Sequence, residues 1–161
     1  VQRIYIMGLF GPTKGTAESA IKFVNQFLTE AGLNPNTCLC QDNQDLSAWS
    51  LSRGSAPLLV IVFKDPNFPF IRVLSHIVKM PEQDQVGPLL HYCMIKNTNC
   101  PATIGLDSNA SEIIVQSGRP IEGLDKEELD GMMACVSGVA DDLDNELAEK
   151  FGCEMIGEDP S

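Results

Sequence analysis

Six cysteines are the residues of this sequence with the widest chemistry, because a thiolate can bind zinc, exchange disulfides or attack a substrate. They are Cys38, Cys40, Cys93, Cys100, Cys135 and Cys153. One residue separates the first two and six separate Cys93 from Cys100, whereas zinc knuckles and thioredoxin-like sites place two residues between their cysteines. The spacing therefore predicts no metal site, and we expect reduced structural thiols in a cytosol-like compartment.

Two other patterns resemble a binding site or a reactive site. The segment Gly8–Thr16 has the composition of a phosphate loop, but Thr13 stands where such a loop needs a glycine before its lysine. The histidines, His76 and His91, have no serine or cysteine nucleophile in a recognisable local motif. Neither pattern predicts catalysis, and the sequence indicates no cofactor.

The net charge of −11 is concentrated at one end of the chain. Residues 122–161 hold thirteen Asp or Glu and only two Lys, whereas residues 1–121 hold nine acidic and nine basic residues. With a sequence pI near 4.4, this acidic region would repel nucleic acid and anionic membrane surfaces. We expect a basic or amphipathic polypeptide as the partner, and neither nucleic acid nor a membrane.

Four closely spaced carboxylates, at Asp141, Asp142, Asp144 and Glu146, could suggest a cation site. Calcium loops, however, need a turn-forming glycine and regularly spaced oxygen ligands, and the neighbouring apolar residues here keep helical spacing. The simplest interpretation is a solvated helix face. An electrostatic docking face for a basic partner is the alternative.

The predicted C-terminal helix that holds these carboxylates also carries an apolar stripe, which includes Met132 and Met133. These methionines are most simply core residues. The alternative is that part of the stripe forms a dimer interface, because methionine adapts well to contact surfaces. The residues that we predict to contact a partner are Asp141, Asp142, Asp144, Glu146, Met132 and Met133.

Hydrophobic periodicity predicts three helices and five main strands to carry these residues. The helices are expected at Ala17–Ala31, at Pro88–Lys96 and from a cap at Asp125 to Phe151. The strands are expected at Leu46–Arg53, Leu58–Lys64, Phe70–Val78, Ala102–Leu106 and Glu112–Ser117, with a further short strand at Thr37–Gln41. The main order α-β-β-β-α-β-β-α describes an α+β fold, with the helices packed against an antiparallel sheet.

The length of 161 residues suits one domain, and we expect flexible ends at residues 1–15 and 153–161. The stretch Leu58–Phe63 is apolar on both faces, which predicts a central strand covered on both sides. The longest apolar run, Ala56–Phe63, is far shorter than the roughly 20 residues of a membrane-spanning helix. No signal peptide is visible, and we expect a cytoplasmic protein.

Several short motifs occur together in the second half of the chain. They are Leu89-Leu90 followed by Asn97, Ile104-Gly105-Leu106-Asp107, Ile113-Ile114-Val115, Arg119-Pro120-Ile121 and Gly123-Leu124-Asp125. In this order, from about Phe70 to Phe151, they resemble the YbjN family and its structural relatives, the class I type III secretion chaperones. The resemblance implies a small acidic protein, commonly a homodimer, without a cofactor or catalytic residues. It also implies that the sheet and helices bind an extended client segment.

We therefore expect a non-enzymatic, chaperone-like or regulatory protein that binds a polypeptide partner through its sheet and its acidic C-terminal helix. Two alternatives stay open. One is a small enzyme that uses a cysteine such as Cys93 or Cys100 as its nucleophile, and the other is a structural subunit of an assembly. An enzyme of this kind would have a thiol that reacts readily with an alkylating probe at neutral pH.

Overall fold

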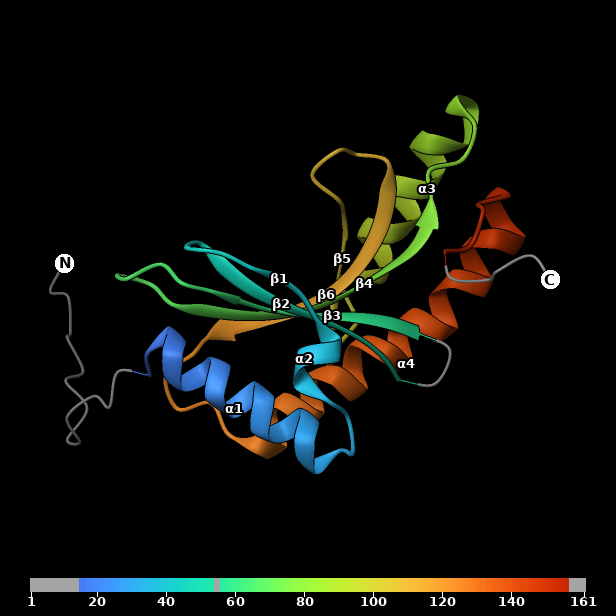
Figure 1. Ribbon diagram of the computed structural model, residues 1–161. Helices are drawn as coiled ribbons and strands as arrows, with labels where there is room; N and C mark the ends of the chain where they lie inside the picture. Colours follow the sequence, from blue (N-terminus) through green and yellow to red (C-terminus); the bar gives the residue numbers. More distant parts are fainter. Residues whose placement is uncertain (1–14, 54–55, 157–161) are drawn as a thin grey trace, which may run out of the picture.

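The computed structural model describes residues 15–53 and 56–156, which form a six-stranded sheet with helices packed on it (Figure 1). The helices are α1 (Ala17–Glu30), α2 (Pro35–Cys38), α3 (Gln83–Lys96) and α4 (Lys126–Phe151). The strands are β1 (Leu39–Asp42), β2 (Leu46–Arg53), β3 (Ala56–Phe63), β4 (Phe70–Lys79), β5 (Thr103–Leu106) and β6 (Glu112–Pro120). Their order across the sheet is β1-β2-β3-β4-β6-β5, and every neighbouring pair is antiparallel. The predicted α+β fold with an antiparallel sheet is therefore confirmed, while the predicted flexible stretches 1–14 and 157–161 lie outside the described residues.

The structure adds a one-turn helix, α2, to the three helices that the sequence predicts. Pro35 stands at the start of α2, where its fixed φ suits a helix. The side chain of Asn34 accepts a hydrogen bond from the backbone N–H of Asn36 over 3.0 Å. β1 follows directly, at Leu39–Asp42 rather than at Thr37–Gln41. A single turn is too short to produce a periodic pattern, so hydrophobic periodicity could not reveal α2.

α3 begins at Gln83, earlier than the predicted start at Pro88. A proline inside a helix removes one hydrogen bond to the carbonyl four residues before it. Here that carbonyl belongs to Asp84, in the exposed first turn, where water can hydrate it. The helix therefore continues through Pro88, and the buried residues Leu89 and Cys93 anchor it.

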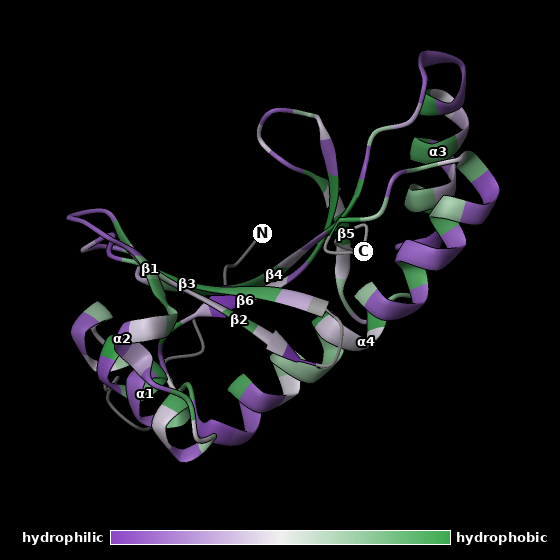
Figure 2. Ribbon diagram, turned by 45° about the vertical axis from the view of Figure 1, so that its right-hand side comes forward, coloured by the Kyte–Doolittle hydropathy of each residue, from purple (hydrophilic) through white to green (hydrophobic). Residues whose placement is uncertain are grey.

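The core lies between the sheet and the helices α1 and α4, which cover the same face (Figures 1 and 2). On β3 this face carries Leu58, Val60 and Val62, all buried, as the alternation of side chains along a strand requires. α4 contributes buried residues at helical spacing, which are Leu129, Met133, Val136, Ala140, Leu143 and Leu147. Each fully buried aliphatic side chain contributes about 1.5–3 kcal/mol, so this layer is the main source of stability.

Trp49 connects the sheet to α1. Its side chain on β2 is buried, and its indole N–H donates a hydrogen bond to Asn25 Oδ1 of α1 over 3.1 Å. α1 itself begins with a capping box, in which Thr16 and Ser19 exchange hydrogen bonds between side chain and backbone. Because a buried donor costs free energy unless it is paired, the bond between Trp49 and Asn25 fixes where α1 lies on the sheet.

The start of α4 follows the predicted capping pattern. Asp125 accepts a hydrogen bond from the backbone N–H of Glu128 over 2.8 Å, and Glu128 accepts one from the backbone N–H of Asp125 over 3.1 Å. At the other end Gly152 has a φ of +67°, a left-handed conformation that favours glycine. The cap predicted at Asp125 is confirmed.

The segment after α4 pairs with the sheet. The backbone N–H of Lys79 donates to the carbonyl of Glu154, and the N–H of Ile156 donates to the carbonyl of Ile77, each over 2.9 Å. These bonds satisfy the edge of β4 beyond the end of β3. Residues 154–156, which fall in the stretch that we expect to be flexible, are thus paired with β4 in the structure.

Asn97 joins the end of α3 to β5. Its Oδ1 accepts a hydrogen bond from the backbone N–H of Ile104 over 2.7 Å, and its Nδ2 donates to the carbonyl of the same residue over 2.9 Å. The predicted hairpin follows, with Asp107 Oδ1 accepting hydrogen bonds from the backbone N–H groups of Ser111 and Glu112. In both places a side chain forms hydrogen bonds with backbone groups and so positions the edge strand β5.

Candidate protein-binding surface

The face of β2, β3 and β4 opposite to α1 and α4 has no helix over it in the described parts of the chain (Figures 1 and 2). Residues that are paired across neighbouring strands share a face. The register of β3 with β4 sets three such pairs on this side, which are Leu59 with Leu74, Ile61 with Arg72, and Phe63 with Phe70. We call these six residues the outer face. Five of the six are apolar, whereas the face of an antiparallel sheet that has no covering layer normally carries polar residues.

β3 is central in the sheet, but the prediction that it is covered on both sides is wrong for the outer face within the described residues. Leu59, Ile61 and Phe63 are only half-buried, while the alternate residues of the strand are buried under the helices. The apolar character of Leu58–Phe63 was the sequence signal for this surface. It could not distinguish a helix of the same chain from a partner as the covering layer.

Arg72 lies among the aromatic residues of the outer face. Its guanidinium carbon is 5.3 Å from the centre of the Phe63 ring and 6.0 Å from that of Phe70, distances at which a ring attracts a cation. Phe70 also covers Gly118 of β6, where an added Cβ would lie 2.6 Å from the ring. Arg72 makes no ion pair with another described residue. Its N–H groups can therefore donate to carbonyl or carboxylate oxygens of a partner.

A histidine–carboxylate pair beside the outer face is the arrangement of described residues that most resembles part of a catalytic site. His76 Nδ1 lies 2.6 Å from Glu112 Oε2, and a depression of about 290 Å³ next to them is also lined by Ser50. A catalytic triad needs a serine hydroxyl hydrogen-bonded to the histidine. No hydrogen bond joins His76 to Ser50 or to another hydroxyl or thiol in residues 15–53 and 56–156. The pair therefore links β4 to β6 without forming a triad.

Three of the cysteines, Cys93, Cys135 and Cys153, lie in surroundings that oppose thiolate formation. Burial, with a smaller effect from the neighbouring Cys153, raises the pKa of the Cys93 thiol to about 11. Burial also raises the pKa of Cys135 and of Cys153. A thiol with a raised pKa is a poor nucleophile at neutral pH, which argues against catalysis by Cys93. No group of three His, Cys, Asp or Glu side chains suited to a metal ion occurs among the described residues.

Met132 and Met133, two of the residues predicted to contact a partner, lie on the core side of α4. Met133 is 3% exposed, and Met132 is half-buried against the core. Their position fits the core interpretation of the apolar stripe. Because α4 covers the opposite face of the sheet (Figure 2), the structure does not bring these methionines together with the outer face.

The four carboxylates predicted to contact a partner lie in different surroundings along α4. Asp142 and Glu146, one helical turn apart, line a groove of about 330 Å³ together with apolar residues of α4 and β5. Asp141 and Asp144 are half-buried on the same helix. The groove is thus lined by both apolar and charged residues, Lys96 among the latter, and it belongs to the α4 side of the sheet.

Glu146 holds α3 and α4 together. Its carboxylate accepts hydrogen bonds from the Lys96 ammonium, over 2.7 Å, and from the Tyr92 hydroxyl. The Tyr92 ring also packs on Phe151, with the ring centres 5.5 Å apart. The bonds from Lys96 and then from Tyr92 lower the pKa of Glu146, so this carboxylate is engaged in a structural contact.

Glu146→Gln is expected to destabilise the domain more at neutral than at acidic pH. The folded state lowers the pKa of Glu146 below its ordinary value of 4.5, so the carboxylate contributes stability that is fully present above this value and is lost as the pH falls through the lowered pKa. Urea denaturation should show a loss of about 1 kcal/mol in the free energy of unfolding near pH 7 and a smaller loss near pH 3. Glu149→Gln, an exposed change on the same helix, is the control. An equal loss from Glu146→Gln at both pH values contradicts this account.

No helix within the described residues is both long and apolar enough to cross a bilayer. The sequence matches no protein-family model and no curated protein. Its likeness to known proteins therefore lies in the fold.

Several solved structures have a similar fold. In the structure of the HopA1–SchA chaperone–effector complex, the matching chain is 15% identical, with a TM-score of 0.53, and the match covers 77% of this chain and 91% of that one. For the Yersinia pestis type III secretion chaperone SycH, solved with a stable fragment of YscM2, the identity is 16%, the TM-score 0.51 and the coverage 76% and 97%. For YbjN from E. coli the identity is 12%, the TM-score 0.50 and the coverage 84% and 95%. Nearly the whole length of each relative is matched, and this chain has the fold that the type III secretion chaperones share with YbjN.

Proposed function

We propose that this chain is a non-enzymatic, chaperone-like protein-binding domain that holds an extended polypeptide segment against its outer face. The observation that carries the proposal is the mainly apolar outer face of the two central strands β3 and β4, which has no helix over it in the described residues. Two structures of similar fold support it, because the HopA1–SchA complex and the SycH complex each contain a polypeptide partner.

The spacing of the outer face suits an extended partner. Leu59, Ile61 and Phe63 recur at every second residue of β3, a repeat of about 6.6 Å along a strand. A partner in the extended conformation repeats its side chains at the same interval, so alternate apolar residues can contact this row. Arg72 adds donors for the backbone carbonyls of the partner.

The acidic C-terminal region would act at longer range. α4 and the residues after it carry most of the excess negative charge, and such a field attracts basic residues that flank the apolar segment of a partner. Asp141, Asp142 and Asp144 contribute through their charge rather than through contact with the outer face. The association rate constant should therefore fall as the salt concentration rises.

The expected homodimer would use α3 and the edge of β5 in this proposal. Met94 and Ile95 on α3 are 72% and 55% exposed, and Leu106 on β5 is 38% exposed, and a second copy could bury these apolar side chains. Ile95→Asp should convert a dimer to a monomer in light scattering after size exclusion. Leu33→Asp, at a 38% exposed leucine between α1 and α2, should leave the mass unchanged. A monomeric wild-type chain would contradict the dimer.

Selection from a library of random peptides, displayed on phage and about 16 residues long, tests the proposed function without knowledge of the natural partner. The purified full chain should enrich sequences with alternating apolar residues flanked by Lys or Arg. Enrichment of no sequence, or only of sequences that bind equally well after the outer face is altered, would contradict the proposal.

A further inference from the structure

A hollow of about 570 Å³ lies at one end of the sheet. It is lined by the start of α1, by the turn between β3 and β4, and by the end of β6. Phe68 lies in that turn and is 59% exposed. A volume of this size accommodates several side chains.

Phe68 is held in its exposed position by the turn itself. Asp65 Oδ1 accepts hydrogen bonds from the backbone N–H groups of Asn67 and Phe68, over 2.8 and 3.0 Å. The Phe68 ring stacks on Phe70, with the ring centres 6.0 Å apart. Because Phe70 belongs to the outer face, this ring contact joins one lining residue of the hollow to the outer face.

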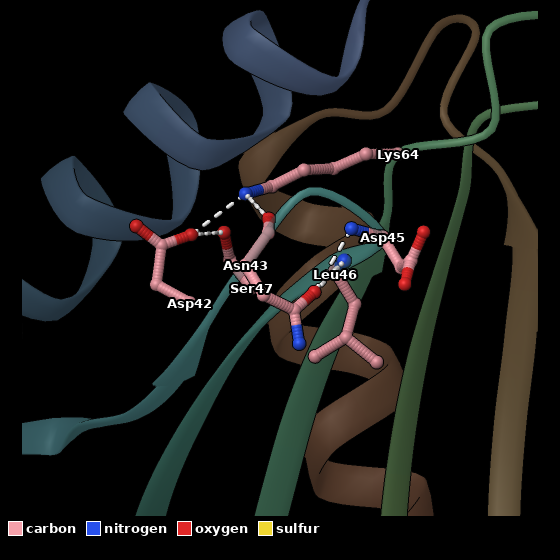
Figure 3. A network of polar contacts seen from close by, with 6 residues as sticks. All are labelled: Asp42, Asn43, Asp45, Leu46, Ser47 and Lys64. Atoms are coloured by element: carbon pink, nitrogen blue, oxygen red, sulfur yellow. Dashed lines mark hydrogen bonds and ion pairs between the residues drawn. The ribbon is translucent and has the colours of Figure 1, made fainter.

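The charge around the hollow is mainly acidic. Glu18, Asp65 and Glu122 line it, and Lys64 is the basic residue among the lining residues. The Lys64 ammonium contacts Asp42 Oδ1 and the carbonyl of Asn43, each at 2.6 Å (Figure 3). Its charge is therefore shared with the β1–β2 turn, and the hollow favours an apolar segment that carries basic residues.

The described part of the chain begins at this hollow. Gly15 is one of its lining residues and packs closely against Ile121, the residue after β6, since a Cβ on Gly15 would lie 2.9 Å from Ile121 Cγ2. Residues 1–14 contain Arg3 and Lys14 and no acidic residue. Their large apolar residues are Ile4, Tyr5, Ile6, Met7, Leu9 and Phe10.

The distance along the chain also suits this hollow. Phe10 precedes Gly15 by five residues, which span at most about 17 Å when extended. Gly11 and Pro12 between them favour a change of chain direction. A short tether gives an effective concentration on the order of millimolar, so even a weak contact between this segment and the hollow is populated.

We propose that residues 4–10 of this chain occupy the hollow beside Phe68 and extend toward Phe70, so that the chain partly covers its own outer face. The contact joins an apolar, basic segment to a hollow of the same molecule that offers the exposed Phe68 ring and a mainly acidic lining. A further consequence rests on the proposed function, because an external peptide would have to displace this segment from the Phe70 end of the outer face.

Hydrogen–deuterium exchange of the full chain, without an added ligand, tests the contact. The amides of residues 4–10 should exchange at least tenfold more slowly than those of a synthetic peptide of residues 1–14. Phe68→Ser should abolish this protection, and so should the double change Leu9→Ser with Phe10→Ser, which leaves the described core untouched. Leu33→Ser serves as the control at a remote exposed leucine.

Exchange of residues 4–10 at the rate of the synthetic peptide would overturn the proposal. Protection that persists both in Phe68→Ser and in the double variant would overturn it as well, because the segment would then lie elsewhere. Since no ligand is present, these results are independent of peptide selection. Failure of the contact would leave the proposed function standing, and failure of peptide selection would leave the contact standing.

Discussion

Ile61→Asp is expected to weaken binding of a selected peptide by about 100-fold or more while the domain stays folded. Burial of an isoleucine side chain contributes about 1.5–3 kcal/mol, and a carboxylate placed in an apolar contact loses hydration as well. A total near 2.7 kcal/mol corresponds to about 100-fold in affinity. In the free domain the new carboxylate would lie opposite Arg72, an arrangement of opposite charges that antiparallel strands tolerate.

Titration calorimetry of the wild type, Ile61→Asp and Leu33→Asp with one selected peptide would measure this effect. Leu33 is a suitable control. Like Ile61 it is a partly exposed aliphatic residue, but it lies between α1 and α2 and not on the outer face. Circular dichroism should give the same spectrum for all three proteins. Unchanged affinity in a folded Ile61→Asp protein would contradict binding at the outer face.

Trp49→Ala is expected to reduce the free energy of unfolding by about 3–5 kcal/mol, the range for removing a large buried aromatic residue. Trp49 is 1% exposed. Its loss would leave a cavity between β2 and α1 and would leave Asn25 Oδ1 without its donor. Urea denaturation followed by circular dichroism would measure the loss.

Two milder changes separate packing from hydrogen bonding at this position. Trp49→Phe keeps an aromatic ring and should cost less than the alanine change, while Asn25→Ala removes only the acceptor and should cost about 1 kcal/mol. A loss below about 1 kcal/mol for Trp49→Ala would mean that α1 does not depend on this contact.

Local sequence patterns were sufficient to predict most of the fold. The stripe of α1, the reciprocal cap at Asp125 and Glu128, and the bounds Leu46–Arg53 of β2 all follow from interactions among residues close in sequence. Each of these patterns agrees with the tertiary structure, which is what a well-specified fold requires. The order of these elements along the chain then indicated helices packed against an antiparallel sheet.

Features that depend on distant residues could not be predicted in the same way. The return of Ile156 to Ile77 joins parts of the chain that no periodic pattern connects. The setting of Arg72 between two aromatic rings depends on the register of β3 with β4. The carboxylates of α4 were the most conspicuous charged residues, yet the structure places them on the other side of the sheet from the outer face.

Methyl NMR of the domain during titration with a selected peptide tests the central claim most directly. If the peptide binds the outer face, the methyl signals of Leu59, Ile61 and Leu74 should shift with a common dissociation constant. The methyl signals of Val139 and Leu143, which line the groove beside α4, should stay in place. Shifts confined to Val139 and Leu143 would contradict the account, because the partner would then bind the α4 side of the sheet.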